Sequence, residues 1–498
     1  MNAPVSPASL KVLSDSFLAQ THQLFIDGEW VDAQTGQTID VINPATGQVI
    51  AKVQAAGAAD VDRAVQAARR AFDDGPWSRM PASERARLMN RLADLIEGAG
   101  SELGMLECLD NGMPLGMATG MVSMGAPGSL RYNAGWAGKV NGETPTLSQP
   151  NVHAYTLKEP VGVVGAITPW NVPFNIAVAK IAQALAAGCT VVLKPAELTP
   201  LTAVRLGRLI QEAGIPAGVV NIITGYGDPA GKALVEHPDV DKISFTGSTA
   251  TGKWIVQAAT GNLKRVSLEL GGKSPVFVFP DADLEQAIPG AAMGVFINAG
   301  QICVAGSRLY VHKKVFDKVV EGVAGMAANL KVGSGLEPDS VIGPIISERQ
   351  LDRVTGYIQA GVDEGAEIVQ GGRRIGNEGY FVQPTVLAGT GRDMKVVREE
   401  IFGPVVCAMP IDDDDIERLA KTANDTTYGL AAYIWTQNVG LVHKLARRIR
   451  AGSIQVNGGA EMDPALPFGG YKQSGWGREN GIEGIQTFLE TKSVAVRL

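Results

Sequence analysis

The chain has 498 residues, more than one hydrophobic core usually supports, so we expect about three modules. With 45% hydrophobic residues, 19% charged residues and 60 glycines, its composition is typical of an α/β protein with many tight turns and excludes a disordered or fibrous chain. A net charge of −7 without any run of Lys or Arg argues against nucleic-acid and membrane-surface partners, so we expect a small-molecule partner.

The cysteines and the N-terminal segment predict the cellular setting. Cys108, Cys189, Cys303 and Cys407 lie far apart, without the spacing of a zinc site or a disulfide framework, so we expect no bound metal and a reducing environment. The first residues lack both the apolar core of a signal peptide and the arginine-rich pattern of a transit peptide. Together with the absence of long apolar segments, these features predict a cytoplasmic protein.

The first elements expected along the chain are strands and then two helices. Residues 23–53 alternate short apolar runs with Gly, Asn-Pro and Asp-Gly turns, which predicts strands joined by turns. In the second of the helices that follow, Ser83 is the predicted N-cap and Leu residues recur at helical spacing.

From residue 161 onward the pattern predicts alternating strands and helices. Strands are expected within 161–168, 190–194, 219–223, 241–246 and 264–270. One intervening helix should cover 175–187 and end at Gly188, and the next should start at an N-cap Thr199 and end before Gly214. This alternation predicts a doubly wound parallel sheet, whose ligands bind beyond the carboxyl ends of its strands. Sites should therefore follow residues 167, 194, 246 and 270.

A second α/β run is expected over about 272–470, with Cys303 just after a helical segment at 284–298. The last residues, TKSVAVRL, alternate like an edge strand and are too short to form a sheet alone. We expect this strand to pair with a strand from elsewhere, such as another subunit.

Two motifs at the predicted strand ends could bind a dinucleotide. In FTGSTATGK, Gly247 allows close backbone approach and Ser248 precedes a helix whose free N–H groups attract an anion, although an ordinary capped helix explains the motif equally well. In KPAE, Lys194 and Glu197 could bind ribose hydroxyls, and the Glu would repel a 2′-phosphate, which favours NAD over NADP. A surface ion pair is the alternative.

Three residues could carry catalysis. Glu269 ends an apolar strand, where desolvation would raise its pKa and make it a general base, unless it is simply salt-bridged. Asn171 lies in a turn after the first strand, where its amide could stabilise an oxyanion or merely shape the turn. Cys303 could be a nucleophile or, as most free cysteines are, a buried core residue.

The sequence resembles the NAD(P)-dependent aldehyde dehydrogenase superfamily from about residue 23 to the C-terminus. The stretches that carry the resemblance occur in the family's order and spacing: PWN, KPAE, FTGST, LELGGK, GQICVAGSR, EEIFGP and PFGGYKQSGWGRENG. The resemblance implies a Rossmann-like cofactor domain formed by 1–138 and 161–271, and a catalytic α/β domain formed by 272–473. A small β oligomerisation arm, formed by 139–160 and 485–498, would join subunits into dimers or tetramers.

The resemblance also implies roles for individual residues. Cys303 would attack the aldehyde, Asn171 and the Cys303 backbone N–H would form the oxyanion hole, and Glu269 would activate the water that hydrolyses the thioester. Lys180 and Glu479 would relay the proton, although solvated or ion-paired charges explain them equally well. The implied cofactor-binding residues are Thr168, Trp170, Lys194, Glu197, Gly247, Ser248, Gly271, Gln350, Glu400 and Phe402. Among them, Glu400 and Phe402 would hold the nicotinamide end, and Gln350 would touch the adenosine side or lie on a solvated helix face.

The residues that match the family's substrate tunnel are apolar. They are Gly125, Val172, Ile176, Ile297, Ile302, Val304, Met462 and Phe468. This lining favours a hydrophobic aldehyde over a carboxylate-bearing or quaternary ammonium substrate, although the residues could equally form core. FTGSTATGK and LPFGGYKQSG are similar to bacterial enzymes of the phenylacetaldehyde dehydrogenase kind, so we expect an arylacetaldehyde. Terpenoid or medium-chain aldehydes, transfer of the acyl group to coenzyme A, and a catalytically silent protein are the alternatives.

Overall fold

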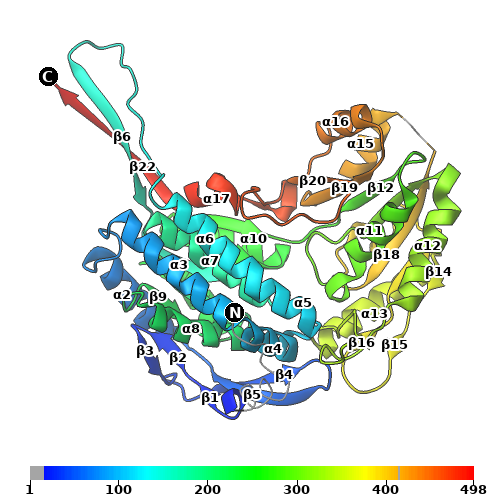
Figure 1. The fold of residues 1–498 in the computed structure, drawn as a ribbon, viewed down its shortest axis with the longest axis horizontal. Coiled ribbons are helices and arrows are strands. Elements are labelled where there is room, and N and C mark those ends of the chain that lie inside the picture. The colour runs from blue at the N-terminus through cyan, green and yellow to red at the C-terminus, as the bar shows by residue number, and fades with distance from the viewer. Residues whose placement is uncertain (1–15, 413–414) are drawn as a thin grey trace.

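Two large open sheets organise the computed structural model, which describes residues 16–412 and 415–498. Figure 1 shows them in two lobes, the first from the N-terminal half and the second mainly from residues after 270. Of the predicted cofactor domain 1–138, residues 1–15 lie outside the described residues. No helix in the described ranges is long and apolar enough to cross a membrane.

Apart from β1, which lies before the predicted range, the N-terminal strands and the two helices occur where the sequence predicts them. The strands are β1 (Thr21–His22), β2 (Leu24–Ile26), β3 (Glu29–Val31), β4 (Thr38–Asn43) and β5 (Gln48–Gln54), and the two helices are α2 (Ala58–Asp73) and α3 (Ala82–Gly98). Ser83 was wrongly predicted as the N-cap of α3. The extended Pro81 occupies that position, so Ser83 falls inside the first turn.

The first sheet has eight strands in the order β21-β11-β10-β7-β8-β9-β2-β3. Its parallel strands are β7 (Val163–Ile167), β8 (Thr190–Lys194), β9 (Val220–Ile222), β10 (Lys242–Thr246) and β11 (Arg265–Glu269). The chain moves outward from β7 through β8 to β9 and then returns to the other side of β7 with β10. This reversal of strand order confirms the predicted doubly wound topology.

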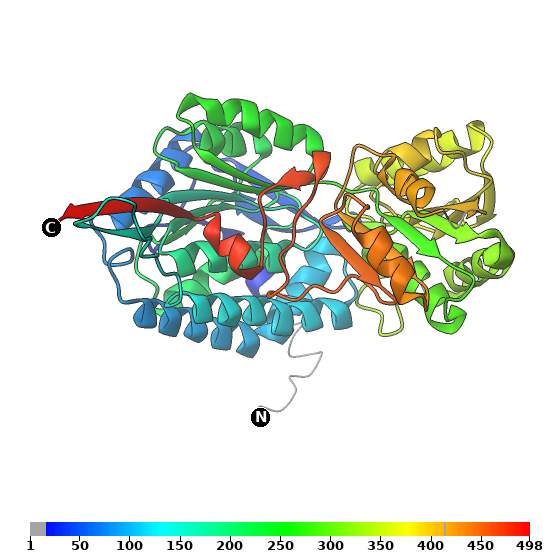
Figure 2. The same cartoon turned by 90° about the horizontal axis from the view of Figure 1, so that it is seen from above.

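Helices cover both faces of this sheet (Figure 2). The helices of this lobe are α2, α3, α4 (Gly100–Asn111), α5 (Leu115–Gly120), α6 (Ala126–Trp136), α7 (Pro173–Ala187), α8 (Leu201–Ala213), α9 (Lys232–Glu236) and α10 (Thr249–Ala258). Side chains alternate along the strands, so Val164 and Ala166 pack in the core with α7 and α8, whereas Val163 and Ile167 pack in the core with α2 and α9. Both faces are therefore buried, as continuous apolar strands require.

The glycines expected to end two of these helices do so. Gly188 and Gly214 are the C-caps of α7 and α8, with φ of 96° and 80°, a conformation that glycine adopts without steric cost. Thr199 is not the N-cap of α8, because Pro200 occupies that position. The carboxylate of Asp110, on α4, instead accepts from the Leu201 amide at 3.0 Å.

The second sheet has seven strands in the order β14-β17-β18-β13-β12-β19-β20. These strands are β12 (Pro275–Val278), β13 (Arg308–His312), β14 (Glu367–Gln370), β17 (Thr385–Ala388), β18 (Val405–Ile411), β19 (Ala431–Trp435) and β20 (Ser453–Val456). The helices of this lobe are α11 (Leu284–Phe296), α12 (Phe316–Asn329), α13 (Glu348–Asp363), α14 (Lys395–Arg398), α15 (Ile416–Asn424) and α16 (Val439–Ala446). A small hairpin, β15 (Arg374–Ile375) with β16 (Phe381–Val382), completes this lobe.

The chain then returns to the first lobe. The short β21 (Gly475–Trp476) pairs antiparallel with the end of β11, so that Gly475 lies opposite Glu269. The helix α17 (Gly481–Gln486) follows and contacts α7. Strand β21 thus covers the edge of the sheet at the carboxyl end of β11.

The C-terminal strand pairs within the chain. β22 (Leu489–Arg497) runs antiparallel to β6 (Val152–Pro160), from Leu489 opposite Pro160 to Arg497 opposite Val152, and this ribbon projects from the body of the molecule (Figure 1). The expected pairing with a strand from elsewhere is thus met by residues 152–160, which supply a complementary edge of equal length. That the ribbon also joins the sheet of another subunit stays a prediction.

Candidate active site

A cavity of about 460 Å³ opens at the carboxyl ends of the first sheet, at the point where the strand order reverses. Its lining comes from the loops after β7, β10 and β11, from the Cys303 turn, and from α13 and the segment after α14. The lining residues are Pro169, Trp170, Asn171, Ile176, Thr246, Gly247, Ser248, Glu269, Leu270, Gly271, Cys303, Arg349, Gln350, Arg353, Glu400 and Phe402. The register of β10 with β7 and β11 aligns these strand ends, which is why segments so distant in sequence meet here.

Cys303 is half-buried and follows a turn with unusual backbone geometry. After α11 ends, Asn298, Ala299 and Gly300 have consecutive positive φ values of 51°, 54° and 70°. Such a conformation costs about 1–3 kcal/mol for each residue other than glycine, so the surrounding structure has to hold the turn. A side chain at position 300 would collide with the Gly403 carbonyl, because its Cβ would lie 2.1 Å from that oxygen.

Burial, together with the nearby carboxylates of Glu400 and Glu269, raises the pKa of the Cys303 thiol to about 12. The resting residue is therefore a neutral thiol at physiological pH. Because the thiolate is the nucleophilic form, reaction at this sulfur requires a base to take the proton.

Asn171 is buried in the turn between β7 and α7. Its side-chain Nδ2 donates to the Gln301 carbonyl at 2.9 Å, two residues before Cys303. A primary amide has two N–H groups, so one of them is left to act at the cavity.

Glu269 ends β11 and is 4% exposed. Within the described part of the chain, its Oε2 has no hydrogen-bond partner. Burial raises the pKa of this carboxyl well above its ordinary value, and the neighbouring Glu479 raises it further, whereas Lys180 and Arg478 lower it. The carboxyl group can therefore accept or hold a proton near neutral pH.

Lys180 and Glu479 form a largely buried ion pair whose charges act on the pKa of Glu269. Lys180, on α7, also donates to Ser244 Oγ at 3.1 Å. The ion-paired arrangement expected as one alternative is thus present, and it lies next to the carboxylate that a proton relay would serve.

Glu400, Phe402 and Gln350 lie together in the cavity. The Glu400 carboxylate accepts from the Gly272 amide at 2.9 Å, and desolvation raises its pKa to about 7. The Phe402 ring packs edge-on against Trp170, with centroids 5.2 Å apart. Gln350 donates to the Phe402 carbonyl at 2.9 Å, so it lies beside Phe402 and not with Lys194 and Glu197, which do not line this cavity.

Lys194 and Glu197 follow β8, the next strand of the sheet. Lys194 is buried, and its Nζ donates to the carbonyls of Pro195 and Gly225 at 2.9 and 2.7 Å. Its Nζ lies 3.8 Å from Glu197 Oε2, and Glu197 is one-third exposed. Thr168, whose amide donates to the Lys194 carbonyl at 3.1 Å, links this segment to the loop after β7.

The remaining predicted cofactor residues lie at the turns after β10 and β11. Ser248 is the N-cap of α10, and its Oγ accepts from the Thr251 amide at 3.2 Å. The Gly247 amide donates to the Glu269 carbonyl at 3.0 Å, which joins the two strand ends. Gly271 packs so close to Glu400 that a Cβ there would lie 2.2 Å from the carboxylate.

The predicted substrate residues do not all face the cavity. Ile176 lines it, whereas Val304 is buried and packs with the core of the second lobe, and Met462 is 59% exposed. Val172, Ile297, Ile302 and Phe468 are half-buried, and Gly125 is exposed.

The sequence reasoning missed several residues at the site. Thr246, Arg349 and Arg353 line the cavity, and Asn111 and Asn298 both donate to the Asn171 carbonyl. Thr246 belongs to FTGSTATGK, and its place at the end of a predicted strand is a signal for a residue of the site. No local pattern marks the other four.

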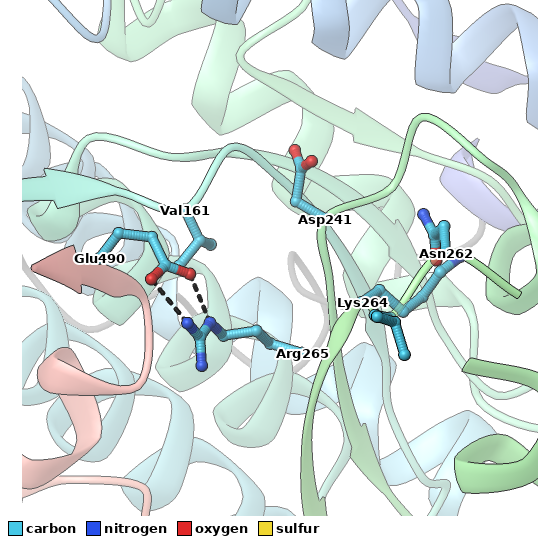
Figure 3. Close-up of a pocket in the computed structure, with 7 residues that line it drawn as sticks. Val161, Asp241, Asn262, Lys264, Arg265 and Glu490 are labelled. Carbon is cyan, nitrogen blue, oxygen red and sulfur yellow. Dashed lines mark hydrogen bonds and ion pairs between the residues drawn. The ribbon is translucent and has the colours of Figure 1, made fainter. Parts of the chain in front are cut away.

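A second hollow lies at the opposite, amino-terminal edge of the sheet (Figure 3). It is lined by Val161, Asp241, Asn262, Leu263, Lys264, Arg265 and Glu490. Arg265 and Glu490 form a bidentate ion pair between the body and β22. The hollow lacks the thiol and the converging strand ends of the first cavity, so we assign the chemistry to the first.

The fold and the site define an enzyme with a doubly wound sheet and a cysteine thiol at the point where the strand order reverses. The aldehyde dehydrogenase family model matches residues 30–494. A Bacillus subtilis relative named aldehyde dehydrogenase DhaS is 51% identical over 484 residues, which cover 97% of each chain. A phenylacetaldehyde dehydrogenase from Pseudomonas fluorescens is 46% identical over 95% of this chain and 96% of its own.

Solved structures agree with these relatives. The NAD⁺ complex of an aldehyde dehydrogenase from Bacillus cereus has a TM-score of 0.96 and 46% identity, and it covers 100% of both chains. An indole-3-acetaldehyde dehydrogenase from P. syringae, in complex with NAD⁺ and IAA, has a TM-score of 0.96 and 41% identity over 99% of this chain and 100% of that one. The chain belongs to the aldehyde dehydrogenase family.

Proposed function

We propose that this enzyme oxidises a hydrophobic aldehyde to the carboxylic acid with NAD, and that an arylacetaldehyde is its substrate. The observation that carries the proposal is the convergence of Cys303, Glu269 and Asn171 on one cavity at the switch point of the sheet. A thiol, a carboxyl with a raised pKa and an amide are the groups that covalent aldehyde oxidation requires.

In the first step, the Cys303 sulfur attacks the aldehyde carbon and forms a thiohemiacetal. Glu269, whose raised pKa allows it to accept a proton near neutral pH, is our candidate for the base that takes the thiol proton. The second N–H of the Asn171 amide and the backbone N–H of Cys303 would stabilise the developing oxyanion. Removing one such donor typically lowers kcat by about 10²–10³-fold.

In the second half of the reaction, water releases the acid and restores the thiol. NAD, when bound, supplies the two-electron acceptor that converts the thiohemiacetal into a thioester. Glu269 then deprotonates the water that attacks the thioester carbon, and the C–S bond breaks. The ion pair of Lys180 and Glu479 adjoins Glu269 and would carry its proton away from the cavity.

The residues at the strand ends fit a dinucleotide. The free N–H groups at the start of α10, behind Gly247 and Ser248, would bind the pyrophosphate, and Trp170 adjoins them in the cavity lining. The carboxylates of Glu197 and Glu400 would accept from ribose hydroxyls, since one is one-third exposed and the other lines the cavity. Phe402, Gly271, Thr168 and Gln350 would shape the nicotinamide half, and Lys194 would hold Glu197 in place.

Two observations support an arylacetaldehyde. Ile176 lines the cavity together with Cys303 and offers apolar contact. One relative at 46% identity is a phenylacetaldehyde dehydrogenase, and one structural neighbour is an indole-3-acetaldehyde dehydrogenase. Val172, Ile297, Ile302, Met462 and Phe468 would extend the apolar lining toward solvent, whereas Val304 would act through packing.

We further propose a homo-oligomer in a reducing, cytoplasmic setting. The arm of β6 and β22 is a two-stranded ribbon, which is rarely stable alone and gains stability when another sheet or subunit covers it. All four cysteines are unpaired, and Cys303 must stay a free thiol to react. Sedimentation of the full chain and of a chain ending before β22 would test the role of the arm.

The decisive experiment measures kcat/KM for a panel of aldehydes with NAD. Phenylacetaldehyde and indole-3-acetaldehyde should exceed geranial, medium-chain aliphatic aldehydes and betaine aldehyde, and Cys303→Ala should abolish turnover. The acid should be the product both with and without coenzyme A. Turnover in the Cys303→Ala variant would refute the mechanism, and a preference for geranial would refute only the substrate class.

A further inference from the structure

The Asn171 turn and the Cys303 turn hold each other through two reciprocal side-chain amides. Asn171 Nδ2 donates to the Gln301 carbonyl at 2.9 Å, and Asn298 Nδ2 donates to the Asn171 carbonyl at 2.9 Å. Each turn thus donates a side-chain N–H to the backbone of the other. Asn171 and Asn298 are 5% and 4% exposed, so water cannot easily replace either hydrogen bond if it breaks.

A third amide, that of Asn111, also holds the Asn171 turn. Asn111, the last residue of α4, donates from Nδ2 to the Trp170 carbonyl at 2.7 Å and to the Asn171 carbonyl at 3.3 Å. The Asn171 carbonyl therefore accepts from side chains of both lobes. Its peptide plane is fixed by these two contacts, and so is the direction in which the Asn171 side chain leaves the backbone.

The other end of the network is anchored in the second lobe. The Gln301 side chain accepts from the Ile346 amide at 2.9 Å and donates to the Asn298 carbonyl at 3.2 Å. The turn it holds contains Asn298 and Ala299 in the left-handed region, which residues other than glycine keep only when their surroundings impose it. The network therefore explains why the turn keeps this conformation.

We propose that Asn298 is a positioning residue that acts through Asn171 and aims the free N–H of the Asn171 amide at the oxygen of the Cys303-bound substrate. The inference rests on the proposed function. One N–H of the Asn171 side chain donates to the Gln301 carbonyl. Asn298 and Asn111 hold the Asn171 backbone carbonyl, and together these contacts set the direction of the second side-chain N–H. Oxyanion stabilisation depends on this direction, because the donor has to meet the oxygen without reorganising.

A double-mutant cycle tests the proposal with the full-length enzyme. Asn298→Asp keeps the shape and removes the donor, and we expect it to lower kcat about 10- to 100-fold, the usual effect of a displaced catalytic group. Asn171→Ala should lower kcat at least as much. The double variant should be no slower than Asn171→Ala, because Asn298 has no effect once the amide that it positions is gone. A purely structural role would slow the reaction in both backgrounds by the same factor.

Two further variants keep the test decisive. Asn298→Gly accepts the left-handed backbone and removes the side chain without adding charge, so it replaces Asn298→Asp if that variant fails to fold. Asn221→Asp is the matched control, because Asn221 is also buried and donates to a backbone carbonyl, that of Gly218, at 2.8 Å, but lies outside the cavity. Its Tm should fall while its kcat stays within about 2-fold of the wild type.

The outcomes separate this inference from the proposed function. A wild-type enzyme that oxidises no aldehyde with NAD would overturn the proposed function. A wild-type enzyme that is active, together with effects of Asn171→Ala and Asn298→Asp that multiply, would overturn the positioning role alone. An Asn298→Asp variant as fast as the wild type would do the same.

Discussion

The backbone amide of Gly272 donates to the Glu400 carboxylate at 2.9 Å, and Gly271 lies so close to the same carboxylate that a Cβ would approach Oε2 to 2.2 Å. Gly271 and Gly272 thus position the Glu400 carboxylate, which is proposed to bind the nicotinamide ribose. A side chain at position 271 would collide with the carboxylate and displace it.

Gly271→Ala should therefore raise the KM for NAD about tenfold, because one misplaced hydrogen bond to a charged group costs about 1.5–3 kcal/mol. Steady-state kinetics at saturating aldehyde would measure it. Gly116→Ala is the control, since a Cβ there meets no atom within 4 Å. An unchanged KM in Gly271→Ala would remove Glu400 from the proposed cofactor site.

Glu269→Gln should slow the first turnover and also slow the steady state, the latter about 10²–10³-fold. The amide can take neither the proton of the Cys303 thiol nor that of the water that attacks the thioester, so NADH and acid should both form slowly and without an initial burst. Stopped-flow absorbance would measure the first turnover. A fast burst of NADH followed by slow release of acid would restrict Glu269 to hydrolysis, and a steady-state rate equal to the wild type would exclude it as a base in either step.

The pH dependence of kcat should also depend on Glu269. The active form of this residue is the carboxylate, and burial raises its pKa well above the ordinary value. The value of kcat should therefore rise with pH, and the rise should occur above the pH range in which exposed carboxyl groups titrate. This rise should disappear in Glu269→Gln. A rise at the pKa of an ordinary exposed carboxyl would show that the group is solvated in the working enzyme.

Glu107 should make stability depend on pH. Burial on α4 raises the pKa of its carboxyl from 4.5 to about 8 in the folded chain. Between these values the unfolded chain releases a proton that the folded chain keeps, so stability should fall as pH rises, by up to about 1.4 kcal/mol per pH unit.

Glu107→Gln removes this titration. Its Tm relative to the wild type should therefore increase between pH 6 and pH 8, whereas the exposed Glu212→Gln should show no such trend. Thermal denaturation monitored by fluorescence at both pH values would measure the difference. A constant difference in Tm would mean that Glu107 is ionised in the folded enzyme.

Glu197 should set the preference between the two nicotinamide cofactors. Its carboxylate lies 3.8 Å from the buried Lys194 ammonium and is one-third exposed, where it would repel a 2′-phosphate. Glu197→Gln should lower the ratio of kcat/KM for NAD to that for NADP about tenfold, which corresponds to about 1.4 kcal/mol of lost repulsion. A wild-type enzyme that favours NADP would contradict this role.

Local sequence patterns predict most of the elements and the edge of the sheet at which the site lies. Apolar runs alternating with helical patterns predicted β7 to β11, and Gly188 and Gly214 marked the ends of α7 and α8. These signals are local, because periodicity and glycine conformation act over a few residues. The rule that ligands bind beyond the strand ends then brought Asn171 and Glu269 to the same edge.

The surroundings of these residues come from packing between segments that are distant in the sequence. The N-cap of α8 was mispredicted because its first amide is satisfied by Asp110, 91 residues away. Asn111 and Asn298, 60 and 127 residues from Asn171, have no local signature, although both hold its carbonyl. The pKa values of Cys303 and Glu269 likewise depend on burial by segments from both lobes. Hydrogen bonds and desolvation between distant segments arise from packing, which no pattern within one segment encodes.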